Sequence, residues 1–165
     1  MMATQVDSHS RATSTDVVVF HVGDIECALD ILQVQEIKRI RVYTPVHRSP
    51  PFVRGLVNMR GQIITLIDVR QRLGLEPRPV GPAAPAIIVA HRGELIGLLV
   101  DEVDDAIEVQ PGHFQPPPSN LRGVEGHFFT AVLRTADGLI AVLDKDRIAG
   151  PETTERDVVF HHGGV

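Results

Sequence analysis

The stretch FVRGLVNMRGQIITLIDVRQRLG, residues 52–74, decides how this chain folds. Two apolar segments flank Asn58-Met59-Arg60-Gly61, which predicts two strands joined by a tight turn that needs its glycine. The second segment runs directly into Asp68, which is well placed to cap a short helix that ends at Gly74. The stretch therefore predicts the order strand, turn, strand, acidic cap and short helix.

A similar order returns near the end of the chain. Residues 131–135 and 139–143 predict a hairpin, and Asp144 then caps a final helical turn. Four features of the first stretch have counterparts in the second half, at spacings that differ by several residues. The pairs are Arg54-Gly55 with Arg122-Gly123, Gly61 with Gly138, Asp68 with Asp144, and Arg70 with Arg147. This internal echo predicts two similar small β-barrels.

The rest of the ordered chain also reads as short strands. Residues 25–31 alternate strictly between apolar and other side chains, so Cys27 is expected to point inward as a small core residue. Residues 86–90 and 95–100 flank a turn and predict another hairpin. Val34, Ile37 and Ile40 are spaced by three, which predicts a brief helical turn instead.

Proline and glycine mark the expected boundaries. We expect one domain over residues 16–149, with a Pro-rich linker at 76–85 that joins the two barrel halves. Residues 1–15 are Ser/Thr-rich and predict a disordered lead, and residues 150–165 predict a tail. The predicted fold class is all-β with a few short helices.

Composition narrows the function. The chain has 22 Val and 13 Ile against seven aromatic residues, which favours a strand-rich core. The net charge of −5 argues against a nucleic-acid binder that works through bulk electrostatics. The single Cys excludes an internal disulfide framework. The polar N-terminus and the lack of a long apolar run predict neither a secretory signal nor a membrane helix, so a cytoplasmic protein is expected.

Signatures of chemistry are missing. The sequence has no GxSxG, Walker A, HExxH or CxxC motif, so we expect no catalytic residues and no cofactor. Five carboxylates lie in residues 100–109 without EF-hand spacing, and we expect a solvated strand face there and no metal site. His127 and Glu125 remain open as a catalytic pair, against the simpler interpretation of surface-loop residues.

Four stretches in this order resemble the CheW family of chemotaxis coupling proteins. The stretch 52–74 carries the most specific match, and the others are residues 30–37, 97–109 and 142–148. The resemblance as a whole runs from about residue 16 to residue 149. His47 and Thr65 stand where the family commonly has Pro, which puts the subfamily and not the family in question.

The resemblance implies a non-catalytic adaptor built from two five-stranded, SH3-like barrels in one CheW-like domain. Its partners would be the cytoplasmic tip of a methyl-accepting chemoreceptor and the regulatory domain of a CheA-type histidine kinase. The protein would stay cytoplasmic and be recruited to membrane-associated receptor arrays. The family places a receptor helical hairpin in a groove between the barrels. Carried over, the groove candidates are Val34, Glu36, Gly55, Asn58, Arg60, Gly97 and Val103.

The chemistry of these candidates suits such a groove. Val34 and Val103 offer an apolar floor, and Glu36 and Arg60 offer charged anchors of opposite sign. Arg60 stands in a turn that presents its guanidinium for bidentate binding of a carboxylate. The simpler interpretation is that Arg60 pairs with an acidic neighbour and holds its own turn.

Two further functions stay open at this point. The first is an adaptor of a pilus-motility or developmental chemosensory pathway in place of a flagellar one. Alternatively, the small barrels bind a ligand such as single-stranded nucleic acid, although seven aromatic residues and the negative net charge argue against that.

Overall fold

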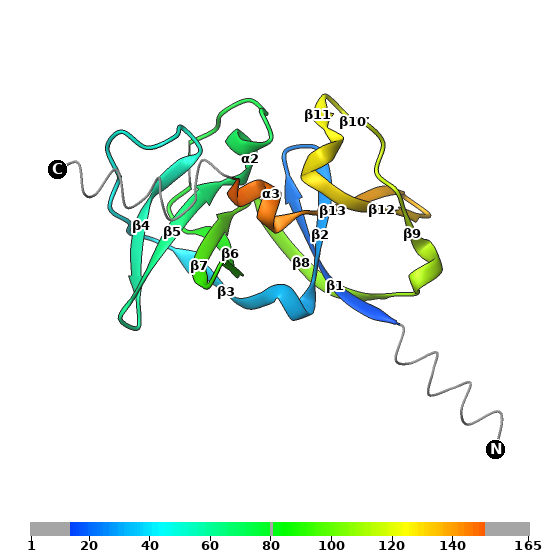
Figure 1. Cartoon of the computed structure of the whole chain (residues 1–165), viewed down its shortest axis with the longest axis horizontal. Helices are drawn as coiled ribbons and strands as arrows, with labels where there is room; N and C mark the ends of the chain where they lie inside the picture. Colours follow the sequence, from blue (N-terminus) through cyan, green and yellow to red (C-terminus); the bar gives the residue numbers. More distant parts are fainter. Residues whose placement is uncertain (1–13, 80, 151–165) are drawn as a thin grey trace, which may run out of the picture.

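The strands of the computed structural model, which describes residues 14–79 and 81–150, fall into two groups that lie side by side (Figure 1). A six-stranded sheet has the order β8 (Glu102–Val109), β1 (Thr15–Val22), β2 (Ile25–Asp30), β13 (Gly138–Leu143), β12 (Phe129–Thr135), β9 (Phe114–Gln115). A five-stranded sheet has the order β3 (Val34–Ile40), β6 (Ala84–His91), β7 (Glu94–Leu99), β5 (Gln62–Asp68), β4 (Val53–Met59).

The remaining elements are short. They are η1 (Ile31–Gln33), α2 (Val69–Arg72), η2 (Pro111–His113), a ribbon of β10 (Asn120–Leu121) and β11 (Val124–Glu125), η3 (Gly126–Phe128) and α3 (Lys145–Ala149). We call the five-stranded sheet with α2 the five-stranded lobe, and the six-stranded sheet with η3 and α3 the six-stranded lobe. The predicted all-β class is confirmed. One sheet has a sixth strand because the two-residue β9 pairs with the outer edge of β12.

Each sheet takes strands from both halves of the chain. β1 and β2 pair with β8 and β13, whereas β6 and β7 pair with β3 and β5. The prediction that residues 76–85 join two separate barrel halves is therefore wrong. Strands on both sides of this stretch belong to the same five-stranded sheet, and Ala84 already begins β6.

The internal echo is real, but its alignment needs correction. The β4–β5 hairpin pairs Val53 with Ile67, and the β12–β13 hairpin pairs Phe129 with Leu143, so the numbering offset is 76. Asp68 and Asp144 match as predicted, and each caps the helix that follows with its side chain. The other three predicted matches are wrong, because Gly55 corresponds to Ala131, Gly61 to Asp137 and Arg70 to Asp146. Gly123 lies in the inserted β10–β11 ribbon.

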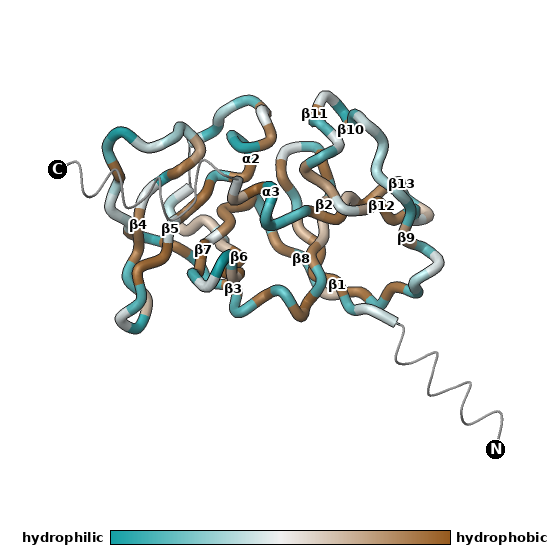
Figure 2. Tube along the Cα trace, in the orientation of Figure 1, coloured by the Kyte–Doolittle hydropathy of each residue, from teal (hydrophilic) through white to brown (hydrophobic). Residues whose placement is uncertain are grey.

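Within residues 14–79 and 81–150, buried apolar residues form three clusters. The central core lies between the lobes and includes Phe20, Cys27, Ile67, Ile87 and Leu143. The interior of the five-stranded lobe includes Ile64, Leu66 and Ile88, and the interior of the six-stranded lobe includes Val19, Ala28 and Ile140. Figure 2 shows hydrophobic segments running along the strands in the middle of the molecule, with hydrophilic turns around them.

One local prediction fails because both faces of β2 are covered. The alternation of residues 25–31 implies that Ala28 lies on the outer face opposite Cys27, yet both are fully buried, Ala28 in a lobe interior and Cys27 in the central core. Burial also raises the pKa of the Cys27 thiol to about 12, which suits an inert core residue.

The predicted helical turn at residues 34–40 is a strand. The bulge between Val34 and Glu36 inserts one residue, so Val34 and Ile37 share a face although they are three residues apart. The predicted tails fall outside the described residues except at their inner ends. There Thr15 begins β1, and Gly150 is the C-cap of α3.

Candidate partner-binding site

The β4–β5 turn holds Arg60 in a left-handed backbone conformation. Arg60 has φ 53° and Gly61 has φ 82°, and the side chain of Asn58 accepts a hydrogen bond of 3.0 Å from the Gly61 N–H. The same Arg-Gly pair of positive φ values recurs at Arg92-Gly93 and Arg122-Gly123. Two-residue hairpin turns favour such values because their twist matches that of the strands.

Arg60 forms an ion pair with Glu36. Its Nη2 lies 2.8 Å from Glu36 Oε2, with the Arg60 side chain 76% exposed and that of Glu36 27% exposed. The other carboxylate oxygen, Oε1, is buried and has no hydrogen-bond partner among the residues described. β3 and β4 are the two edge strands of this sheet. The ion pair therefore links the edge strand β3 to the β4–β5 hairpin, which contains the other edge strand. The two predicted anchors therefore hold one another in this conformation.

Val34 and Val103 occupy matching places in the two lobes. Val34 pairs with Val89, and Val103 pairs with Phe20, and both partners belong to the central core. Both valines are partly buried and pack against that core. They are therefore suited to the predicted role of an apolar floor between the lobes.

The central-core face of the five-stranded sheet continues beyond the core. Ile37 lies opposite Ile87 and is 45% exposed, and Ile63 lies opposite Asn58 and is 59% exposed. Glu36 pairs instead with Ile88, a residue of the lobe interior. The apolar floor and the ion pair thus lie on opposite faces of the edge strand β3, and sequence reasoning missed Ile37 and Ile63 as floor residues.

Gly55 and Gly97 are buried and have packing roles. A Cβ on Gly55 would lie 2.3 Å from the carbonyl oxygen of Thr44, a residue that pairs with Leu56 on the open side of β4. A Cβ on Gly97 would lie 2.8 Å from Leu66 in the lobe interior. Any effect of these glycines on a partner groove is therefore indirect, through the position of the strands.

Asp101 joins the two lobes on one side. Its Oδ2 accepts hydrogen bonds from Arg70 Nη2 at 2.7 Å and from the Gly23 N–H at 2.6 Å. Arg70 follows β5, whereas Gly23 lies in the β1–β2 turn of the other lobe. Sequence reasoning placed Asp101 on a solvated face, and no local signal shows this contact because its partners lie 31 and 78 residues away.

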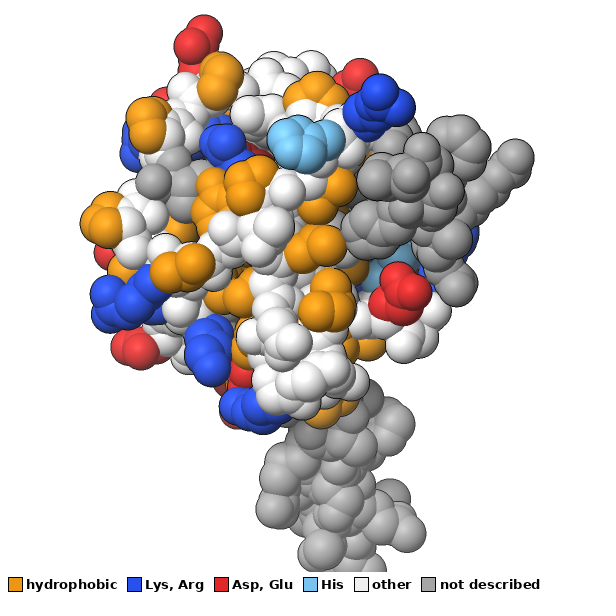
Figure 3. Space-filling view, turned by 90° about the vertical axis from the view of Figure 1, so that its left-hand side faces the viewer, with side chains coloured by type: hydrophobic (Ala, Val, Ile, Leu, Met, Phe, Trp, Pro, Cys, Tyr) orange, Lys and Arg blue, Asp and Glu red, His pale blue; other side chains and the backbone are white. Residues whose placement is uncertain are grey.

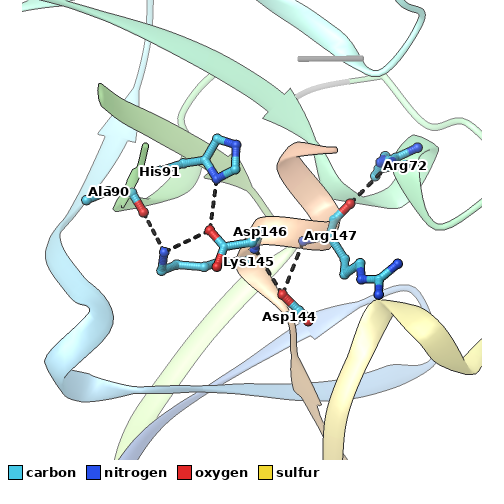
Figure 4. A network of polar contacts seen from close by, with 7 residues as sticks. All are labelled: Arg72, Ala90, His91, Asp144, Lys145, Asp146 and Arg147. Atoms are coloured by element: carbon cyan, nitrogen blue, oxygen red, sulfur yellow. Dashed lines mark hydrogen bonds and ion pairs between the residues drawn. The ribbon is translucent and has the colours of Figure 1, made fainter. Parts of the chain in front are cut away.

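His91 and Lys145 join the lobes on the other side (Figure 4). His91 Nδ1 lies 2.8 Å from Asp146 Oδ1, and Lys145 Nζ donates to the Ala90 carbonyl at 2.7 Å. The hydrogen bond from His91 is the main cause that lowers the pKa of Asp146. These contacts fasten the beginning of α3 to the end of β6.

The alternatives to an interaction surface receive little support. His127 and Glu125 lie 3.0 Å apart, but their side chains are 44% and 75% exposed, and the His127 ring lies against Phe128. No group of His, Cys, Asp or Glu suited to a metal ion occurs within residues 14–79 and 81–150. No aromatic side chain of this part of the chain is exposed, which leaves no stacking platform for bases there. No described helix is long and apolar enough to cross a membrane.

Comparison with known proteins decides the family. The model of the CheW-like domain matches residues 16–151. The chain belongs to the CheW-like family. It is 28% identical over 152 residues to a chemotaxis protein CheW of Rhizobium meliloti (strain 1021), covering 92% of this chain and 98% of that protein. Identity to the chemotaxis protein CheW of Bacillus subtilis (strain 168) is 26%, covering 88% and 94%.

The solved structures agree with the sequence comparison. The scaffolding protein TtCheW from Thermoanaerobacter tengcongensis aligns with a TM-score of 0.75 and 29% identity, over 81% of this chain and 86% of that one. A more distant relative is the protein FrzA of Myxococcus xanthus, 25% identical over 60% of this chain and 62% of its own length. Membership in the CheW-like family makes the chain a non-catalytic scaffold of chemotaxis-type signalling.

Proposed function

We propose that this CheW-like protein couples the cytoplasmic tip of a methyl-accepting chemoreceptor to the regulatory domain of a CheA-type histidine kinase. In this function it is a cytoplasmic protein that is recruited to membrane-associated receptor arrays. Support comes from the family match over nearly the whole described chain and from the apolar floor between two lobes of similar build.

A helical hairpin suits the surface described above. An amphipathic helix in a groove needs apolar contacts along one stripe and charged contacts at its sides. Val34 and Val103 flank the central core, and Ile37 and Ile63 extend the apolar surface outward. Figure 3 shows that the side of the molecule where β4 and β5 lie exposes hydrophobic side chains between separate charged ones. This mixture is typical of a contact that forms and dissociates, since obligate interfaces are more uniformly apolar.

The exposed Arg60 of the β4–β5 turn supplies the charged part of the proposed groove, and Glu36 holds it from the face of β3 opposite the apolar floor. Because the Arg60 side chain is 76% exposed, it can reach a receptor carboxylate without unfolding its turn. Asn58 is exposed beside it and fixes the turn through Gly61. We assign Gly55 and Gly97 no direct contact, since both are buried. The kinase is expected to bind elsewhere on the two lobes, which lets one chain hold both partners.

Co-sedimentation with receptor-containing membranes and the cognate kinase tests the proposal. We expect wild-type protein to carry the kinase to the membranes and Arg60→Ala to do so about tenfold less, because a hydrogen bond to a charged group contributes about 1.5–3 kcal/mol. Arg92→Ala is the matched control. Arg92 stands in the same kind of Arg-Gly turn with φ 51°, so it shares the charge change and the backbone strain.

The outcomes separate the function from the residue. If wild-type protein recruits no kinase with any receptor of its own genome, the adaptor function is wrong. If both variants recruit the kinase equally well, the adaptor function stands and the assignment of Arg60 is wrong. Receptors from flagellar and from other chemosensory pathways, tested separately, identify the pathway that the protein serves.

A further inference from the structure

Arg72 lies at the junction of the two lobes and has contacts on every side. Its guanidinium carbon lies 4.6 Å from the centre of the Phe52 ring and 5.2 Å from the centre of the Phe128 ring. Its Nε donates to the Ile148 carbonyl at 2.9 Å, and its Nη2 donates to the Arg147 carbonyl at 3.1 Å. Figure 4 shows Arg72 pointing toward the end of α3.

These contacts connect opposite lobes. Phe52 leads into β4 and Arg72 ends α2, so both belong to the five-stranded lobe. Phe128 and Ile148 belong to the six-stranded lobe, and α3 lies between the two groups of strands (Figure 1). Phe52 and Phe128 are equivalent under the offset of 76, and each accepts a backbone hydrogen bond from its capping aspartate at 2.7 and 2.8 Å. Arg72 thus lies between equivalent rings of the two lobes.

Only arginine supplies this combination of contacts. A planar guanidinium stacks on aromatic rings while its N–H groups donate in the plane, whereas an ammonium group lacks the flat faces. The last carbonyls of a helix have no partner within the helix, so the two accepted hydrogen bonds also complete the end of α3. The residue equivalent to Arg72 is Ile148, whose side chain is fully buried. The six-stranded lobe therefore has no counterpart of this arginine, and the contact runs only from Arg72 of the five-stranded lobe to α3 of the six-stranded lobe.

We propose that Arg72 is a positioning residue that fixes the angle between the lobes. A shift of the Arg72 guanidinium between the two rings would change the orientation of the five-stranded lobe relative to α3. Where the adaptor function proposed above holds, the angle between the lobes carries the signal from the receptor groove to the kinase, and Arg72 keeps that angle defined. This second statement rests on the proposed function, and the first does not.

Distance measurement between spin labels tests the first statement. The labels are placed on Glu94→Cys in the β6–β7 turn of one lobe and Asp137→Cys in the β12–β13 turn of the other, both exposed. Cys27 needs no replacement, because it is buried and its thiol pKa is raised to about 12. We expect one narrow distance distribution in the doubly labelled parent. Arg72→Met removes the hydrogen bonds and the charge, and is expected to broaden the distribution at least twofold.

Two further variants keep this test decisive. Arg72→Lys retains the charge without the planar group and is expected to give an intermediate width. Arg134→Met changes an exposed arginine on β12 and is expected to leave the distribution unchanged. Unfolding in urea shows whether each variant is folded, and Arg72→Lys replaces Arg72→Met if the latter is not. A folded Arg72 variant with the parent's narrow distribution overturns the proposal.

Kinase assays on unlabelled protein test the second statement. We expect Arg72→Met to carry the kinase to receptor membranes as wild type does, while control of kinase activity by receptor ligand falls at least fivefold. Full control together with a broadened distribution overturns the link to signalling and leaves the positioning role intact. If wild-type protein recruits no kinase, the adaptor function fails, and the distances alone decide the role of Arg72.

Discussion

The two lobes have the same strand topology but different side chains. β4, β5, β7, β6 and β3 of one lobe correspond to β12, β13, β2, β1 and β8 of the other, in the same order and with the same parallel central pair. Interior positions keep their apolar character, as Ile64 and Ile140 show. The difference lies at one hairpin turn and at the junction of the lobes, where Arg60 corresponds to Ala136 and Arg72 to Ile148. Packing therefore preserves the repeat, and the charged contacts distinguish its two copies.

The open edges of the sheets are also covered differently. In the six-stranded lobe β9 pairs with Val132 and Leu133 of β12. In the five-stranded lobe the single bridge between Thr44 and Leu56 lies at the matching place. The Thr44 backbone can approach β4 closely there because Gly55 has no Cβ. The corresponding residue of the six-stranded lobe is Ala131. One position thus requires glycine in one lobe and not in the other.

The largest effect on stability is expected from Gly55→Ala. The new Cβ would lie 2.3 Å from a backbone oxygen, so the segment around Thr44 must leave β4. We expect a loss of about 3 kcal/mol in the free energy of unfolding, measured in urea. Ala131→Gly is the reciprocal control and is expected to lose about 1 kcal/mol, from chain entropy alone. Equal losses in both variants would show that the lobes do not differ here.

A medium effect is expected where the lobes are joined through Asp101. Asp101→Asn leaves the guanidinium of Arg70 without its counter-charge, although the Arg70 side chain is only 11% exposed. We expect a loss of about 2 kcal/mol in the free energy of unfolding. The control is Asp104→Asn on the same segment. Asp104 pairs with His21 at 2.6 Å, but both side chains are more than one-third exposed, so we expect a loss below about 0.5 kcal/mol.

The smallest effect is expected at the opposite junction. The hydrogen bond from His91 lowers the pKa of Asp146, so this carboxylate stabilises the fold above its ordinary pKa of 3.8, and the gain is lost as the pH falls through the lowered value. Because the Asp146 side chain is 63% exposed, we expect a contribution of no more than about 0.5 kcal/mol.

Urea unfolding between pH 2 and pH 7 measures this contribution. Asp146→Asn is expected to lose stability at pH 7 and to match wild type at the acid end. Asp105→Asn on β8 is the control, since Asp105 is exposed and no hydrogen bond or ion pair of its side chain occurs among the described residues. A constant difference across the whole pH range would show that His91 does not favour the ionised carboxylate.

The parts of the fold that sequence predicted are those that local signals determine. Arg-Gly turns and capping aspartates specify the hairpins and the two short helices, because a turn type or a cap depends on a few adjacent residues. The exchange of strands between the halves depends on pairing over long separations, which no local pattern records. The strand at residues 34–40 was missed because a bulge imitates the spacing of a helix.

The candidate site was predicted in part for the same reason. The resemblance supplied Val34, Glu36, Arg60 and Val103, and the structure places the two valines against the central core. The sequence could not show that Glu36 and Arg60 pair with one another, or that Asp101 and Arg72 join the lobes. These contacts depend on residues that are distant in sequence. The repeat identified equivalent residues of the two lobes only when the numbering offset of 76 was known from the structure.

The exchange of strands also sets the order in which the molecule can be completed during synthesis. The five-stranded sheet needs β7, which ends at Leu99, but β1 and β2 gain β13 only when Leu143 has been made. At about 5–20 residues per second, these first strands wait on the order of ten seconds for that partner. The lobe that begins first is therefore finished last, and β2 lacks its parallel partner β13 during the interval.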